Sequence, residues 1–320
     1  MIVAHISGGL GNQFFQYAMA RQVAADLGVE LRLDVFSYRS DRLRTYALDH
    51  FRTNARTASW ADVFRLCPMM AIGRLAPRPF YERAWCGLNR LGIKPICRSR
   101  AGESGLATSE TKLFHRNVMA ERQTTFDSEA CRCPDERMIV GNWPNEKYFI
   151  RIRRELQHEL EHKLAPSIRD HEILERMRDG ESTAMHIRRG DKVGNPTFKA
   201  TSAEYCRKAM LEVSRRLHKP QFYIFSDDPA WVASQIGLGS NITIIDHHAP
   251  GEVQEDFRLM SACKHQIIAS SSLSWWAAWL NEHPNKVVVS PPASHWVQRA
   301  GCDTSQILPS EWTIVDAGAD

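Results

Sequence analysis

Two adjacent arginines near the middle of the chain offer the chemistry of an anion site. They lie in the segment Met185-His186-Ile-Arg188-Arg189-Gly190-Asp191, after an apolar run that predicts a buried strand. A guanidinium stays charged at any working pH and binds phosphate oxygens bidentately, and a glycine lets the chain turn sharply. The segment therefore predicts a diphosphate site. The alternatives are a surface turn whose arginines pair with carboxylates, and an Arg-Gly-Asp adhesion loop, which would require secretion.

Three consecutive serines, Ser270 to Ser272, precede the apolar segment 273–280, which predicts a buried helix. The first turn of a helix exposes backbone N–H groups and carries partial positive charge, so hydroxyls at that point fit a phosphate. The simpler interpretation is that the serines only cap the helix and that its tryptophans fill the core. The two interpretations are compatible.

Asp256 is a further candidate, because it lies on a predicted helix whose apolar residues Phe257 and Met260 face inward. A carboxylate accepts two hydrogen bonds side by side, and it therefore fits the N1–H and 2-amino edge of a guanine. Taken alone, this residue would be an ordinary solvated acid.

These residues depend on the elements that position them, and the second half of the chain alternates strands with helices. Strands are predicted at 183–187, 222–225, 242–245, 266–269 and 286–289, and helices at 202–217, 229–236, 252–263 and 273–281. Such alternation predicts a parallel sheet covered on both faces. Ligands of these sheets bind at the carboxyl ends of the strands, where Arg188, the segment 226–228 and the three serines fall.

The first half opens with a predicted βαβ unit, made of strand 2–6, helix 12–27 and strand 29–35. Its turn, Ser7-Gly-Gly9-Leu-Gly11, with Asp34 at the end of the next strand, imitates a dinucleotide-binding fingerprint. Phe14 stands where the third glycine should be and obstructs close helix packing, so a dehydrogenase is disfavoured. Beyond it, residues 50–135 give no clear pattern, 137–140 predicts a strand, and 144–164 predicts one long helix.

Two histidine patterns raise the question of a metal. His158-Glu159-Leu-Glu161-His162 spells the His-Glu-x-x-His motif of zinc proteases, but both histidines fall on the solvated face of the predicted helix. His247-His248 lies in a loop with no third ligand nearby in the sequence. The chain contains no Asp-x-Asp that would hold a metal-bound diphosphate, so we expect no metal cofactor.

Composition describes an ordinary globular protein. The 320 residues are 43% hydrophobic and 24% charged with a formal net charge of +4, which argues against disorder and against a nucleic-acid partner. No signal peptide and no apolar run of about eighteen residues is visible, so a cytoplasmic protein is expected. The eight cysteines have no zinc-knuckle spacing and are predicted to be thiols.

Taken together, five segments resemble the α-1,2-fucosyltransferases of glycosyltransferase family 11. They are 7–18, 141–149, 186–191, 225–228 and 271–280, which come in family order and span nearly the whole chain. The resemblance implies a metal-independent, inverting enzyme of the GT-B fold. It would move L-fucose from GDP-fucose to the 2-hydroxyl of a galactoside, usually while a bacterial surface polysaccharide is built.

The same resemblance implies a nucleotide-binding role for five residues. Arg188 would hold the β-phosphate, His186 would contact the ribose or guanine side, and Asp256 would take the guanine edge. Ser271 and Ser272 would cradle the diphosphate.

Five more residues receive roles in the same way. Asp191 and Lys192 would brace or touch the nucleotide, and Asn12 would face the fucose and the acceptor as a catalytic residue. Gly9 and Gly11 would join Asn12 in binding the donor. The core-fucosylating relatives are thought to use a glutamate shortly after the arginine pair as their base, and the segment 192–196 holds none. Asp191 is the candidate base, with a weakly assisted dissociative route as the alternative.

We therefore expect an α/β protein of the GT-B type, with two Rossmann-like domains whose parallel sheets face across a cleft. Residues 1–175 would form an N-terminal, mainly acceptor-side domain, and residues 176–320 the GDP-sugar-binding domain. The expected partners are GDP-fucose and a galactose-containing oligosaccharide or lipid-linked glycan, with peripheral contact to the inner membrane as an option. The alternatives are another linkage, another GDP-sugar, or a non-catalytic nucleotide- or glycan-binding protein.

Overall fold

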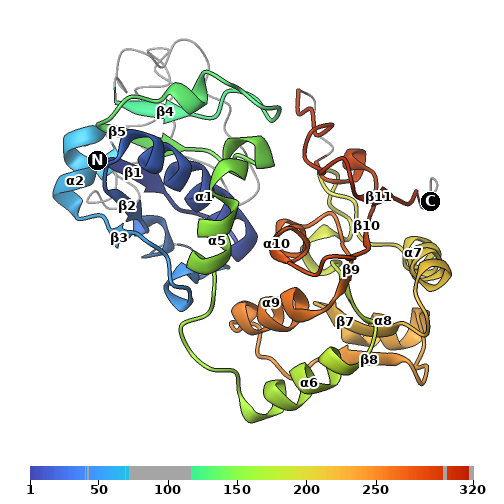
Figure 1. Ribbon diagram of the computed structural model, residues 1–320. Helices are drawn as coiled ribbons and strands as arrows, with labels where there is room; N and C mark the ends of the chain where they lie inside the picture. The colour runs from blue at the N-terminus through green and yellow to red at the C-terminus, as the bar shows by residue number, and fades with distance from the viewer. Residues whose placement is uncertain (40, 42, 69, 72–116, 298–300, 317–320) are drawn as a thin grey trace. The chain divides into compact units, whose positions relative to one another are not determined.

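The computed structural model describes residues 1–39, 41, 43–68, 70–71, 117–297 and 301–316 (Figure 1). The chain divides into two compact units, Met1–Glu161 and His162–Asp320. We expected a boundary after residue 175. The division falls earlier because helix α6 (Ile168–Asp179) packs against helix α9 (Val253–Ala262) of the second unit.

The first unit is built on a five-stranded parallel sheet with the strand order β3-β2-β1-β5-β4. Its strands are β1 (Ile2–His5), β2 (Leu31–Asp34), β3 (Arg56–Thr57), β4 (Val118–Ala120) and β5 (Arg137–Val140). The strands predicted at 2–6, 29–35 and 137–140 are confirmed, whereas β3 and β4 fall in the region that gave no clear pattern.

Within the described residues of this unit, helices α1 and α2 pack against the sheet. Helix α1 (Leu10–Leu27) packs along β1 and β2 and ends at Gly28, whose φ of 64° is the left-handed conformation that glycine adopts without strain. Helix α2 (Trp60–Leu66) begins at Ser59 with a capping box and packs Val63 and Leu66 against Val3 of β1.

The long helix predicted over 144–164 is wrong. The segment instead forms two short 3-10 turns, η5 (Glu146–Tyr148) and η6 (Ile150–Ile152), followed by helix α5 (Arg153–Glu159). Tyr148 and Phe149 are both fully buried, and they pack against different partners. The backbone of Phe149 turns away from helical geometry (φ −142°), so that its ring reaches Phe15 while Tyr148 packs on Trp143.

The second unit is built on a six-stranded parallel sheet with the order β11-β10-β9-β6-β7-β8. Its strands are β6 (Ser182–Ile187), β7 (Gln221–Ser226), β8 (Ile242–Ile245), β9 (His265–Ile267), β10 (Val288–Ser290) and β11 (Thr313–Ile314). Its remaining helices are α7 (Ala203–Arg216), α8 (Pro229–Gln235) and α10 (Ser272–Leu280). The predicted alternation of strands and helices is confirmed here.

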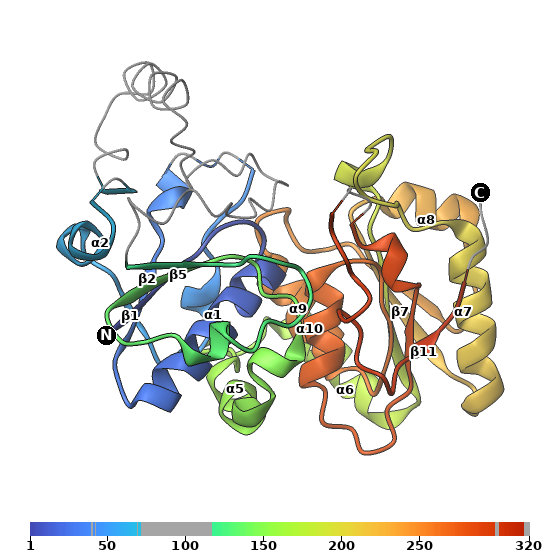
Figure 2. The ribbon, with the colours of Figure 1, turned by 90° about the horizontal axis from the view of Figure 1, so that it is seen from above.

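The two faces of this second sheet carry different helices, with α7 and α8 on one side and α9 and α10 on the other (Figure 2). Met185 and Ile187 of β6 pack into the core that α7 and α8 cover. Successive residues of a strand point to opposite faces, so His186 between them points toward α10. This alternation decides which helix supplies the partner of that histidine.

Helix α6 was missed by the sequence patterns because it is rich in charged residues and buries little apolar surface. Ile173 and Met177, one turn apart, are its buried hydrophobic residues, while the side chain of Ser167 caps its start by accepting a hydrogen bond from the Asp170 N–H. Ser167 followed three residues later by an acid is an N-terminal signature that would have predicted it.

Further short 3-10 turns lie at η1 (Phe36–Arg39), η2 (Leu48–His50), η4 (Ala130–Arg132), η7 (Gly190–Lys192) and η8 (Ala293–His295). None of the six cysteines within the described ranges forms a disulfide, and Cys86 and Cys97 lie outside those ranges. No helix in the described part of the chain is long and apolar enough to span a bilayer.

Candidate functional site

Arg188 follows β6 at the carboxyl edge of the second sheet, as predicted, and its guanidinium lies between two carboxylates. One of its terminal nitrogens is 2.7 Å from Asp227 Oδ2, and the other is 2.8 Å from Asp191 Oδ1. Asp191 is the more exposed acid, with 53% of its side chain accessible against 22% for Asp227. The alternative interpretation, in which the arginines pair with carboxylates, is thus also present in the structure. An incoming anion would have to replace one of these two carboxylates.

Arg189 is engaged differently from its neighbour. Its guanidinium lies 4.0 Å from the ring centroid of Trp231 and donates to the backbone oxygen of Thr201. The backbone N–H of Arg189 donates to Asp227 Oδ1 at 2.8 Å. A Cβ atom at position 190 would lie only 2.8 Å from Asp227 Oδ2. Glycine is therefore required at position 190 for the close approach of Asp227. Of the two arginines, Arg188 is the one placed for a ligand.

His186 is buried and its Nδ1 lies 2.9 Å from the hydroxyl of Ser274 on α10. The oxygen of that hydroxyl also lies 3.3 Å from the backbone oxygen of Ser271 and 3.3 Å from the backbone nitrogen of Ala269. Burial, together with the charge of Arg188, lowers the pKa of His186 to about 3, and the ring is neutral at working pH.

Lys192 lies in the turn η7 and is buried. Its ammonium donates to the backbone oxygen of Ser270, is 3.3 Å from the hydroxyl of the same residue, and lies 5.5 Å from the ring centroid of Phe198. Burial, followed by the neighbouring charge of Arg188, lowers the pKa of Lys192 to about 8. Two cationic side chains are thus held at the same edge of the sheet.

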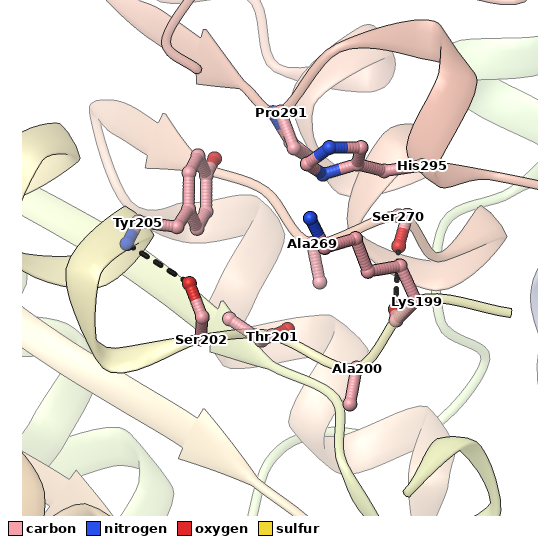
Figure 3. Close-up of a pocket in the computed structure, with 9 residues that line it drawn as sticks. All are labelled: Lys199, Ala200, Thr201, Ser202, Tyr205, Ala269, Ser270, Pro291 and His295. Carbon is pink, nitrogen blue, oxygen red and sulfur yellow. Dashed lines mark hydrogen bonds between the residues drawn. The ribbon is translucent and has the colours of Figure 1, made fainter. Parts of the chain in front are cut away.

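A small pocket opens beside Ser270 at this edge (Figure 3). The side chains of Lys199 and His295 point toward it from opposite sides, and Tyr205 and Pro291 close it. Sequence reasoning missed Lys199 and His295, because they are far apart in the chain and carry no motif.

The serines at the start of α10 lie where the sequence placed them. Ser271 is the N-cap residue, and its side chain makes no capping hydrogen bond. Ser272 opens the first turn of the helix, whose tryptophans Trp275, Trp276 and Trp279 are buried, as the core interpretation predicted. The hydroxyl that does organise this turn belongs to Ser274, which was not predicted.

Asp256 lies in the first turn of α9 with about a third of its side chain exposed, and Oδ1 accepts a hydrogen bond from His248 Nδ1 at 2.7 Å. His248 and His247 both contact Asp170 of α6. The loop that lacked a third metal ligand nearby in sequence therefore has one in space.

The first unit presents a glycine turn at the carboxyl end of β1. Gly9 is the N-cap of α1, Asn12 lies in its first turn as predicted, and Gly11 lies inside the helix rather than before it. The strained position is Gly8, whose φ is 76° and where a Cβ would lie 3.2 Å from the side-chain nitrogen of Asn12. Of the turn glycines, Gly8 is the one whose backbone conformation requires glycine.

Buried amides and one carboxyl hold this edge, and sequence reasoning assigned them no role. Gln13 donates to the backbone oxygens of Gly8 and Thr45 and accepts from the Ala47 N–H. Gln16 accepts from the Ser7 N–H, and Glu121 accepts from the N–H groups of Asn142 and Trp143. Burial raises the pKa of Glu121 to about 7. These hydrogen bonds hold the backbone in place. The two side chains that bind the glycine turn, Gln13 and Gln16, are uncharged amides.

The dehydrogenase and zinc-protease interpretations are disfavoured, because residues that each would need make other contacts. Asp34, which would bind a ribose in a dehydrogenase, is fully buried and pairs with His5 at 2.9 Å. Glu159 of the His-Glu-x-x-His pattern is buried against Tyr17 and Arg21.

The two histidines of that zinc-protease pattern do not share a helix. Helix α5 ends at Glu159, and the boundary between the two units separates His158 from His162. His158 is exposed as predicted. The solvated position predicted for His162 is wrong, because its Nε2 lies 2.8 Å from the backbone oxygen of Gln254.

Two parallel α/β units, one of them with an arginine, a lysine and a helix N-terminus at its carboxyl edge, agree with the GT-B architecture expected of a glycosyltransferase. The family model for glycosyl transferase family 11 matches residues 97–315, and the chain belongs to that family. It is 25% identical to an alpha-1,2-colitosyltransferase of Escherichia coli over 99% of both chains. It is also 34% identical to the galactoside 2-alpha-L-fucosyltransferase SEC1 of Bos taurus, over 30% of this chain and 27% of that one.

The fold has a solved counterpart. The fucosyltransferase NodZ from Bradyrhizobium superposes with a TM-score of 0.50 at 14% identity, covering 86% of this chain and 90% of that chain. The two-unit parallel architecture predicted from the sequence is thus confirmed as GT-B-like.

Proposed function

We propose that this protein is an inverting transferase that moves L-fucose from GDP-fucose to the 2-hydroxyl of a galactoside. The observation that carries the proposal is Arg188, which stands at the carboxyl edge of a sheet in a chain of glycosyl transferase family 11. The relatives support the donor and the linkage, since one is named as a galactoside 2-alpha-L-fucosyltransferase and another as an alpha-1,2-colitosyltransferase.

The leaving group in this proposal is the diphosphate of GDP. Negative charge grows on the β-phosphate as the sugar departs, and a guanidinium fixed nearby stabilises that charge in the transition state. Asp191 is the exposed partner of Arg188, so the incoming phosphate takes its place while Asp227 keeps holding the other side of the guanidinium. Ser271 and Ser272 at the start of α10 and the ammonium of Lys192 supply further donors.

The nucleoside is read by two residues in this proposal. Asp256 has one carboxylate oxygen fixed by His248 and about a third of its side chain exposed, which suits the N1–H and 2-amino edge of guanine. The Nε2 of neutral His186 suits a ribose hydroxyl, which can either donate or accept a hydrogen bond.

The acceptor side is assigned to Asn12 and the turn with Gly9 and Gly11. A sugar is neutral and presents hydroxyl groups, and the buried amides of the first unit hold this turn without adding charge. Asp191 remains the proposed base once the diphosphate has displaced it from Arg188. The proposed chemistry uses no metal on the diphosphate.

The test is turnover of GDP-fucose with a panel of β-galactosides, in the presence of EDTA, followed by GDP release and product mass. We expect a product heavier by one deoxyhexose, with an α-1,2 linkage by NMR. GDP-colitose is the comparison donor, because colitose lacks one hydroxyl group that fucose carries. Faster transfer from GDP-colitose than from GDP-fucose would change the assigned donor to GDP-colitose. GDP binding without any transfer would favour a non-catalytic nucleotide-binding protein.

A further inference from the structure

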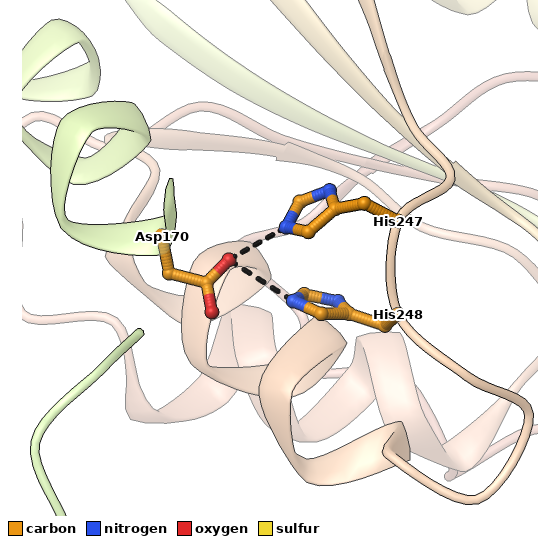
Figure 4. A group of neighbouring side chains, drawn as sticks. All are labelled: Asp170, His247 and His248. Atoms are coloured by element: carbon orange, nitrogen blue, oxygen red, sulfur yellow. Dashed lines mark hydrogen bonds and ion pairs between the residues drawn. The ribbon is translucent and has the colours of Figure 1, made fainter. Parts of the chain in front are cut away.

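A cluster of two histidines and one aspartate lies in the second unit, away from the arginine pair. Asp170 comes from α6, and His247 and His248 come from the loop after β8 (Figure 4). The Nε2 atoms of both histidines point to the same carboxylate oxygen, at 2.7 Å and 3.0 Å. All three side chains are at least nine-tenths buried.

We propose that Asp170, His247 and His248 form a binding site for one divalent transition-metal ion, with zinc the ion that the donors fit best. Two imidazole nitrogens and one carboxylate oxygen are a common ligand set for zinc, with room for water as a fourth ligand. The three donor atoms lie within 4.8 Å of one another. Bonds of about 2.0–2.1 Å at tetrahedral angles separate ligand atoms by about 3.3 Å, so small side-chain rotations admit the ion.

The groups behind these ligands support the assignment. A histidine that binds a metal through one nitrogen usually donates its other N–H to a carboxylate, which fixes the ring and increases its basicity. His248 makes that contact, with Nδ1 2.7 Å from Asp256 Oδ1. The second oxygen of Asp170 accepts from the hydroxyl of Ser167 at 2.8 Å. The carboxylate and one imidazole are therefore already oriented.

The ion would fasten three elements of the second unit. It joins α6 to the loop after β8, and through the His248–Asp256 contact it reaches α9. Its role is structural, and it does not rest on the proposed transfer reaction.

The experiment measures zinc binding to the full chain after EDTA treatment and removal of the chelator. We expect one zinc ion per chain by equilibrium dialysis with elemental analysis, a rise in melting temperature on adding zinc, and a cobalt(II) absorption spectrum of a nitrogen and oxygen site. His247→Ala and Asp170→Asn should lose this binding. Asp256→Asn removes only the supporting carboxylate and should weaken it by about 10–100-fold.

The matched control is His158→Ala, an exposed histidine in the zinc-protease pattern, which should bind zinc as the wild type does. Each variant is checked for folding by circular dichroism, and His247→Gln replaces His247→Ala if that variant unfolds. Equal zinc affinity in the folded His247 and Asp170 variants would overturn the site. A thiolate-to-cobalt absorption band would also overturn it, because it would assign the ion to cysteines.

Discussion

The carboxyl edges of the two parallel sheets share a layout and differ in what fills it. At the edge of the first sheet, buried Gln13 and Gln16 bind the backbone of a glycine turn, and buried Glu121 binds the backbone that follows β5. At the edge of the second, Arg188 and Lys192 bring positive charge to strand ends and the start of a helix. The same architecture thus carries buried side chains that bind backbone groups in one place and cationic side chains in the other. Under the proposed function, the anionic donor belongs at the second sheet.

Removing the guanidinium of Arg188 is the strongest test of the difference between the two edges. Arg188→Ala should lose about 3 kcal/mol or more of transition-state stabilisation, on the order of a hundredfold or greater in kcat, because charge on the leaving phosphate is left unbalanced. Arg207→Ala, an exposed arginine on α7, is the control and should turn over normally. Near-normal turnover in the Arg188 variant would remove that residue from the mechanism.

A substitution of Asp256 tests whether the second sheet's edge also recognises the guanine of GDP. Asp256→Asn should weaken GDP binding roughly tenfold to a hundredfold, since hydrogen bonds to a charged group contribute about 1.5–3 kcal/mol. Inosine diphosphate, which lacks the 2-amino group, should lose far less affinity in the variant than GDP does. Calorimetry with both nucleotides measures the effect, and Glu255→Gln on the same helix is the control. Equal losses for the two nucleotides would contradict a contact to the 2-amino group.

A substitution of Gln13 tests the edge of the first sheet. Gln13→Ala removes three hydrogen bonds to backbone groups, of which the Ala47 N–H is buried, and an unsatisfied buried group costs about 1–3 kcal/mol, so urea denaturation should show a loss of roughly 2 kcal/mol. Gln22→Ala on the same helix removes one hydrogen bond, to Asp26, and should cost less. GDP binding to the folded Gln13 variant should be unchanged. Lost GDP binding would show that the two edges are not independent.

Lys192 gives the smallest expected effect and a pH dependence. Its folded pKa is lowered to about 8, so the ammonium loses its charge as the pH rises through that value. GDP affinity should therefore fall several-fold between about pH 7 and 9, and binding above pH 8 should take up a proton. Calorimetry in buffers of different ionisation enthalpy measures the proton, and Lys192→Met should abolish both effects. An unchanged pH profile in that variant would exclude Lys192 as the source.

Sequence patterns predicted the second unit better than the first for a physical reason. Its strands are apolar on both sides and alternate with helices, so their positions follow from hydrophobicity alone. Residues 144–164 show where such patterns fail, because the apolar spacing predicted one helix, whereas the backbone leaves helical geometry at Phe149 (φ −142°) between two 3-10 turns. Helix α6 shows the opposite failure, since a charged helix with two buried apolar residues leaves almost no periodic signal.

By itself, the sequence determined the two parallel α/β halves, the place of the arginine pair at a strand end and the family. These follow from local periodicity and from motifs whose residues are adjacent in the chain. The tertiary structure alone decided that Arg188 is held by Asp227 and that Ser274 contacts Nδ1 of His186. It also decided that Asp170 meets His247 and His248, because partners separated by dozens of residues meet only when strands and helices pack.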